Sequence, residues 1–203
     1  MNVIKDEQYS IAGLSFSGRV TRDVPVTTAI ERTAAASSAL AAGVAGTLTT
    51  RTDDNTGVVT AAGHALIQND VVTVFWTGGI RYGMTVGVVA GDDVPVDGGA
   101  GDVLPADETA VVIAEQDVLD VDFDGDLVEL IAIKATGRAH LVFAENDDTV
   151  LHPQELTAGE PWSWASGQGT PNPLTGDPVG KIKLANGTTA AIDVVGGIGR
   201  EDA

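Results

Sequence analysis

The chain of 203 residues contains no cysteine. A disulfide framework, a thiolate nucleophile and a cysteine-ligated zinc site are therefore excluded. A chain of this length does not need covalent support, because folding buries roughly 70% of the surface that such a chain exposes when unfolded. We therefore expect ordinary side chains to supply the whole core.

Basic residues are scarce: 11 lysines and arginines stand against 29 aspartates and glutamates, giving a formal net charge of -18. The basic residues are scattered along the chain and form no patch in the sequence. Binding to a nucleic-acid backbone depends on clustered lysine and arginine that displace counterions. We therefore expect no nucleic-acid partner, and the negative charge favours solubility.

Long apolar runs are also missing. The longest stretch of small apolar residues, 39–46, is far shorter than the ~20 residues that a membrane-spanning helix needs. The first residues, Met1–Gln8, contain no basic region that leads into an apolar segment. We therefore expect neither a secretory signal nor a membrane partner.

Aromatic residues make up only 4% of the chain, whereas glycine occurs 25 times and valine, alanine and threonine are plentiful. Small and β-branched side chains combined with many glycine turns are typical of β proteins. We predict an all-β fold made of small β-barrel or sandwich modules with an extended N-terminal arm.

Residues 46–114 are predicted to form a first β module, a small barrel or sandwich of five or six short strands. The turn residues 53–57 lie between two strand-like segments, and Thr77-Gly78-Gly79 lies between two more, so each predicts a hairpin. The segment 97–102, which consists mainly of glycine and aspartate, is predicted to be a loop.

Residues 115–203 are predicted to form a second β module, either separate from the first or continuous with it in one domain. Three strand-like segments between residues 118 and 144 predict a meander. A long polar loop, 145–178, is predicted next, since it holds five of the eight prolines of the chain. Asn186-Gly187 predicts a tight hairpin between the last two strands, and it is the strongest hairpin signal in the sequence.

Residues 1–45 are predicted to be an arm followed by a linker, with a strand or extended segment over 9–20. The alanine-rich stretch 34–42 is compatible with a short helix. Threonine, serine and the flanking Gly43 argue against one, so both alternatives stay open.

Two groups of residues are candidates for a protein interface. Ile11, Leu14 and Phe16 lie in the arm, whose pattern is too irregular for a core element, so either a neighbouring subunit or the chain's own modules must cover them. Trp162 and Trp164 are spaced so that both point the same way in an extended segment. They are expected either to cap the core or to contact a partner, because tryptophan is enriched at interface hot spots.

The sequence predicts no catalytic site, no metal site and no cofactor. His64, His140 and His152 lack the spacing of metal-binding histidines, and no serine lies in a nucleophile elbow. His140 stands beside an apolar run and is predicted to be a strand residue. The adjacent acidic pairs, such as Asp53-Asp54, fall in predicted turns, where aspartate bonds its own backbone.

One acidic segment is similar to a calcium-binding loop. Asp120, Asp122 and Asp124 match the opening of an EF-hand loop, but its twelfth position is Ile131 instead of a bidentate acid. Because apolar and acidic residues alternate here, we predict a strand that enters a turn and no calcium site.

The block 76–87, Trp-Thr-Gly-Gly-Ile-Arg-Tyr-Gly-Met-Thr-Val-Gly, and the block 94–105, Val-Pro-Val-Asp-Gly-Gly-Ala-Gly-Asp-Val-Leu-Pro, resemble uncharacterised structural proteins of tailed phages and prophages. Gly46–Asp53 and Gly63-His64 are similar to the same group. The resemblance covers about residues 46–114 and implies a virion protein, with no active-site residue to carry over.

We therefore expect a non-enzymatic structural protein located in the virion, which binds copies of itself and other virion proteins such as the major capsid protein. The first expectation is a capsid decoration or cement protein that stabilises the capsid. A tail-tube or tail-associated subunit is the second, a non-viral surface or adhesion module the third, and a hydrolase the last.

Overall fold

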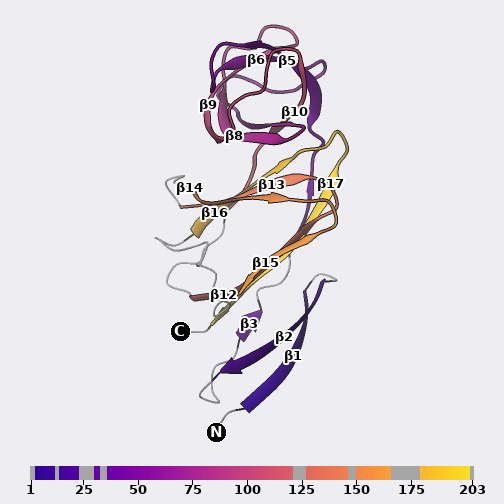
Figure 1. The fold of residues 1–203 in the computed structure, drawn as a ribbon, viewed down its shortest axis with the longest axis vertical. Coiled ribbons are helices and arrows are strands. Elements are labelled where there is room, and N and C mark those ends of the chain that lie inside the picture. Colours follow the sequence, from indigo (N-terminus) through magenta and orange to yellow (C-terminus); the bar gives the residue numbers. More distant parts are fainter. Residues whose placement is uncertain are drawn as a thin grey trace.

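The computed structural model of the chain describes residues 3–11, 14–22, 30–32, 36–120, 127–145, 150–165 and 179–201. The regular structure in these ranges consists of strands, which confirms the predicted all-β fold. The described ranges contain no helix that is long and apolar enough to cross a membrane. A closed barrel lies at one end of the molecule, a hairpin at the other, and two sheets lie between them (Figure 1).

The barrel is antiparallel and has six strands. They are β5 (Val44–Arg51), β6 (Gly57–Thr60), β7 (Val71–Trp76), β8 (Gly79–Val86), β9 (Asp93–Gly101) and β10 (Thr109–Glu115). Their order around the barrel is β10-β5-β6-β9-β8-β7, and β7 closes on β10. The predicted hairpins β5–β6 and β7–β8 are confirmed by this pairing.

The predicted loop at 97–102 is wrong for most of its length, because β9 continues to Gly101 and pairs with β8. Gly98, Gly99 and Gly101 have φ values of 78°, 71° and 102°, which glycine tolerates better than other residues. A Cβ atom on Gly99 would lie only 2.5 Å from the carbonyl oxygen of Tyr82. The glycines that suggested a loop thus allow β9 to lie close against β8.

Apolar side chains fill the barrel, among them Leu48, Val59, Val72, Val74, Met84, Val94, Val96, Leu104 and Ile113. β6 alternates between buried and half-buried residues, as a strand with one covered face does. In β7, by contrast, four consecutive residues from Val72 to Phe75 are buried. One face of β7 lines the barrel, and the other packs on the second module.

The second module contains two sheets. The four-stranded sheet has the order β11-β16-β13-β14, with β11 (Asp117–Asp120), β13 (Ala139–Glu145), β14 (Val150–Leu156) and β16 (Val179–Asn186). The five-stranded sheet follows the path β15-β12-β17-β3, and β4 also pairs with β17. Its strands are β3 (Ile30–Arg32), β4 (Ala36–Leu40), β12 (Leu127–Ala135), β15 (Pro161–Ala165) and β17 (Ile192–Glu201).

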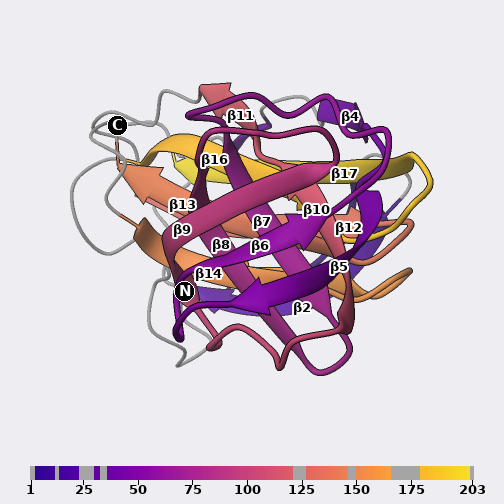
Figure 2. The same cartoon turned by 90° about the horizontal axis from the view of Figure 1, so that it is seen from above.

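Side chains from both sheets meet in one core, which includes Leu40, Ile133, Leu141, Phe143, Leu156, Trp164, Leu184 and Ile192. Seen from above, the barrel lies across the strands of this module (Figure 2). The molecule therefore has two separate apolar interiors, one inside the barrel and one between the sheets.

Two connections predicted for the second module are wrong. β11, β12 and β13 form no meander, because β12 lies in the five-stranded sheet and the other two lie in the four-stranded sheet. β16 and β17 do not pair in the described ranges, although Asn186 ends β16 and Gly187 follows it. Here the chain crosses from one sheet to the other instead of turning back on itself.

Asn186 holds this crossing in place. Its side chain is 2% exposed, and its Nδ2 donates to the carbonyl oxygens of Ala41 and Ala190, each at 2.8 Å. Its Oδ1 accepts from the backbone N–H of Thr188 at 2.9 Å. Because these bonds satisfy the buried amide, the asparagine is explained without a two-residue hairpin turn.

The predicted polar loop at 145–178 is also wrong, because it contains the strands β14 and β15. Pro153 is tolerated in β14, which lies at the edge of its sheet, and Pro161 is tolerated as the first residue of β15. The prolines therefore mark an edge and a strand start in this part of the loop. Residues 166–178 lie outside the described residues.

The first 45 residues are more structured than an arm and a linker. β1 (Val3–Ile11) and β2 (Leu14–Arg22) pair as an antiparallel hairpin, where one strand or extended segment was predicted over 9–20. β3 and β4 pair with β17, so the question of a helix is settled for 36–40, which form a strand. The barrel is thus inserted in the sequence between β4 and β11 of the second module.

Candidate functional site

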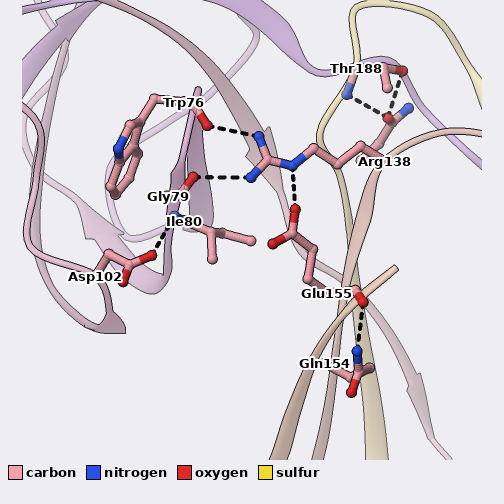
Figure 3. Close-up of polar contacts among 9 residues, drawn as sticks. Trp76, Gly79, Ile80, Asp102, Arg138, Gln154, Glu155 and Thr188 are labelled. Carbon is pink, nitrogen blue, oxygen red and sulfur yellow. Dashed lines mark hydrogen bonds and ion pairs between the residues drawn. The ribbon is translucent and has the colours of Figure 1, made fainter. Parts of the chain in front are cut away.

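The barrel and the second module meet at a joint centred on Arg138, which precedes β13 (Figure 3). Its Nη1 donates to the carbonyl oxygen of Trp76 at 2.9 Å, and its Nη2 donates to that of Gly79 at 3.2 Å. Its Nε donates to Oε1 of Glu155 at 2.6 Å. One guanidinium therefore ties the β7–β8 turn of the barrel to β14 of the second module.

The apolar part of the joint is a cluster of Phe75, Ile80, Ala114 and Ala185. Phe75 is 1% exposed, and the guanidinium of Arg138 lies 5.4 Å from the centre of its ring, which adds a cation–π attraction. A Cβ atom on Gly187 would lie 2.8 Å from the same ring. The glycine at this position is thus required by close packing between the modules.

His140 also lies in the joint. It is a residue of β13, which confirms the predicted strand position, and its ring centre lies 4.4 Å from that of Tyr82 in β8. Its side chain is 2% exposed, and Nδ1 has no hydrogen-bond partner. Burial, helped by the charge of Arg138, lowers the pKa of His140 to about 4, so the ring is neutral at pH 7 and acts by packing.

The other two histidines lie elsewhere. Nε2 of His64 donates to the carbonyl oxygen of Gly91 at 3.1 Å, and its Nδ1 accepts from the N–H of Leu66 at 3.2 Å. His152 stacks on Trp162 with their ring centres 5.8 Å apart. Among the described residues, no group of histidine, aspartate and glutamate is arranged to hold a metal ion.

The calcium-like segment is described only in part. Asp120 ends β11, and Asp122 and Asp124 lie outside the described residues. The prediction that this segment binds no calcium therefore stays a prediction.

Acidic side chains surround the barrel. Residues 44–115 contain two basic and ten acidic residues, a formal net charge of -8. Of the two basic residues, Arg81 is buried and donates to backbone carbonyls and to Oδ1 of Asn55, whereas Arg51 pairs with Asp54. The N–H of Asn55 donates to Asp53 and lowers the pKa of that carboxyl, as expected of aspartate in a turn.

Trp162 and Trp164 both lie in β15 and share a face of that strand. Trp164 is 7% exposed and belongs to the core, as the capping alternative describes. Trp162 is half-buried against the same core, with its ring centre 5.9 Å from that of Phe143. Of the two, only Trp162 remains available to a partner.

The register of β1 and β2 brings the other interface candidates together. Tyr9 lies opposite Phe16, and Ile11 lies opposite Leu14. Opposite and alternate residues share a face, so these four lie on one face of the hairpin together with Val3, Lys5, Glu7, Gly18, Val20 and Arg22. Apart from Ile4, the other face carries polar residues: Asp6, Gln8, Ser10, Ser15, Ser17, Arg19 and Thr21. The hairpin is therefore amphipathic.

Neither β1 nor β2 pairs with any other strand in the described ranges. An isolated two-stranded hairpin is at best marginally stable in water. Its apolar face and its two outer edges can therefore gain stability from a neighbour, which makes the hairpin and the exposed side of Trp162 the candidate interaction site.

Comparison with known proteins provides no relative, since no family model, no curated protein and no solved structure matches the chain.

Proposed function

We propose that this chain is a non-enzymatic structural subunit of a virus particle, most specifically a capsid decoration or cement protein. The observation that carries the proposal is the amphipathic hairpin β1–β2, which lies at the far end of the molecule from the barrel and has no strand partner in the described ranges (Figure 1). Such a segment gains most from burial against another subunit.

The joint between the modules supports a structural role. Arg138, Phe75 and His140 fix the barrel on the second module through hydrogen bonds, apolar packing and ring stacking. A subunit that stabilises a particle must hold its shape when one of its ends is attached. The resemblance of residues 46–114 to structural proteins of tailed phages supplies the class of particle.

The test is the composition of the particles made by the phage or prophage that encodes the chain. We expect mass spectrometry with isotope-labelled standards to find the chain in purified heads, at a fixed molar ratio to the major capsid protein. Heads made without the chain should bind the purified protein to the same ratio and should then resist heat better. Protein that lacks residues 1–22 is expected to bind less.

Three outcomes separate the possibilities. If the chain is found only in the tail fraction, and the purified protein forms rings, a tail-tube subunit replaces the decoration protein. If the chain is absent from purified particles, the proposed function is wrong. If the truncated protein binds heads as the full chain does, the hairpin is not the attachment segment.

A further inference from the structure

We propose that β2 of one copy adds to the open edge of β15 in a second copy, so that the hairpin extends the five-stranded sheet of its neighbour. The inference rests on the proposed role as an assembly subunit and names its partner as the chain itself. Main-chain hydrogen bonds supply the affinity in this mode of recognition, and side chains on alternate positions supply the specificity.

Edge strands of the second module are the available templates, because each pairs on one side only within the described ranges. They are β11 and β14 in the four-stranded sheet, and β15 and the β3–β4 side in the five-stranded sheet. Edges that must not associate usually carry charges, prolines or bulges, or lie under another element. These features separate β15 from the other edges.

β14 has Pro153 at its centre, and its pairing with β13 contains a register shift. β11 has only four residues and an aspartate at each end. β3 includes Glu31 and Arg32, and β4 lies against β16 of the other sheet. Each of these edges thus carries at least one feature that discourages a further strand.

Within the described residues, β15 carries only one of these features, a proline. Its sequence, Pro-Trp-Ser-Trp-Ala, contains no charge, and its only proline is the first residue. Its pairing with β12 runs from Leu130–Ala165 to Lys134–Pro161 without a shift. A regular, uncharged edge next to a half-buried tryptophan is a template for another strand.

The faces of the two strands match. Trp162 and Trp164 lie on the core-facing side of β15, and Ser163 lies on its exposed side. In β2, Leu14, Phe16, Gly18 and Val20 share one face, which ends at Arg22, and Ser15, Ser17, Arg19 and Thr21 share the other. A β2 strand added beside β15 can therefore continue the apolar side of the sheet with apolar residues and the exposed side with polar ones.

Charge complementarity favours a second copy of the chain as the partner. Residues 1–22 contain three basic and two acidic residues, a formal net charge of +1. The rest of the chain contains eight basic and 27 acidic residues, a formal net charge of -19. β2 has Arg19 and Arg22 and no acidic residue, whereas β1 has Lys5 beside Asp6 and Glu7, so β2 is the strand that an acidic neighbour attracts.

The chain has no cysteine, so disulfide trapping between two single-cysteine variants can test the contact directly. One variant carries Ser163→Cys, and its partner carries Ser15→Cys or Ser17→Cys, since both serines lie on the polar face of β2. The matched control replaces Ser163→Cys by Gln68→Cys, which is also an exposed polar position but lies in the connection between β6 and β7 of the barrel. The variants are mixed in pairs, oxidised mildly and separated on non-reducing gels.

We expect mixed disulfide dimers from Ser163→Cys with at least one of the β2 variants, at several times the yield of the Gln68→Cys control. Removal of residues 1–22 should abolish self-association in light scattering, while the protein still melts cooperatively. Arg22→Glu should weaken self-association by about tenfold, equivalent to ~1.4 kcal/mol, and Lys5→Glu on β1 should weaken it less.

Equal yields from Ser163→Cys and the control would overturn the proposal, as would a full-length chain that stays monomeric at all concentrations tested. Neither result would affect the proposed function, since binding to heads in a fixed ratio is measured separately. Conversely, a chain that traps at β15 but is absent from particles would keep this inference and reject the virion role.

Discussion

The barrel and the second module are both antiparallel β structures, but they differ in how far apart in the sequence their paired strands lie. In the barrel, three of the six strand pairs join strands that are consecutive in the chain: β5–β6, β7–β8 and β8–β9. Among the described strands of the second module, one pair of seven, β13–β14, does so. The barrel is therefore largely a local fold, whereas the second module depends on pairings between distant segments.

This difference has an energetic consequence. A pair of consecutive strands closes a short loop, and the entropy cost of closure rises with loop length. β3 and β4 pair with β17, so their sheet forms only when nearly the whole chain has been brought together. We infer that the second module relies more on the packing of its core and on the joint with the barrel.

The largest loss of stability is expected when the ring of Phe75, which packs between the two modules, is removed. Phe75 is fully buried between β7 and the second module, so Phe75→Ala is expected to cost about 3–5 kcal/mol of folding free energy. Urea unfolding measures the loss. Phe143→Ala, in the core between the two sheets, serves as the matched control. A loss from Phe75→Ala below that expected of an exposed residue would show that the joint contributes little.

The joint should also make stability depend on pH. The pKa of His140 is about 4 in the folded protein, against an ordinary value of 6.5, so the unfolded chain takes up a proton first as the pH falls. The contribution is complete above pH 6.5 and is lost progressively as the pH falls towards 4. From pH 7.5 to 4.5 the loss from this group is about 2–3 kcal/mol.

The comparison with His140→Leu isolates this component, because the variant lacks the imidazole and keeps the carboxylates. Arg138 and Glu155, which lies opposite His140 on β14, stay in place in this variant. Chemical denaturation at the two pH values should show a smaller drop for His140→Leu than for the parent. Equal drops would mean that His140 titrates normally.

Substitution of two arginines compares what a contact at the joint and a contact on the barrel surface contribute to stability. Arg138→Met removes three hydrogen bonds, two of which cross between the modules, and should cost about 2 kcal/mol. Arg51→Met removes an exposed pair within the barrel and should cost less than about 1 kcal/mol. Thermal melts of both variants provide the test, and equal losses would contradict the special role of Arg138.

A smaller effect than that of Arg138→Met is expected from Gly187→Ala, at about 1–2 kcal/mol, from crowding of the new methyl group against Phe75. If crowding is the cause, Phe75→Leu should reduce the penalty, because the smaller side chain leaves room. A double-mutant cycle measured by urea unfolding gives this coupling directly. Independent effects would instead point to a cost within the turn itself.

The sequence predicted well where its signals act locally. The turn 53–57 and Thr77-Gly78-Gly79 each join strands that pair directly, so both hairpins were found. Asn186-Gly187 gives an equally clear local signal, but its reason is tertiary: the asparagine bonds to Ala41, and the glycine makes room for Phe75. No local pattern distinguishes an Asn-Gly pair that forms a hairpin turn from one that is required by tertiary contacts.

The candidate site was predicted in part for the same reason. The spacing of Trp162 and Trp164 correctly placed both on one face, but burial of Trp164 depends on the opposite sheet. The shared face of Ile11, Leu14 and Phe16 follows only from the hairpin register. Arg138 was missed, because its partners in the barrel are backbone carbonyls about sixty residues earlier, which leave no mark in the sequence.

The insertion of the barrel between β4 and β11 also delays the pairing of β4 during synthesis. A ribosome releases β4 early, but 152 positions separate Leu40 from Ile192, the first residue of its partner strand β17. At about 5–20 residues per second, β4 waits roughly eight to thirty seconds for that partner. The barrel can complete its pairing in the meantime, so a nascent chain carries a folded domain flanked by unmatched strands. Slow translation or truncated messages should therefore yield aggregates seeded by the first forty residues, and co-translational chaperones should raise the yield of full-length protein.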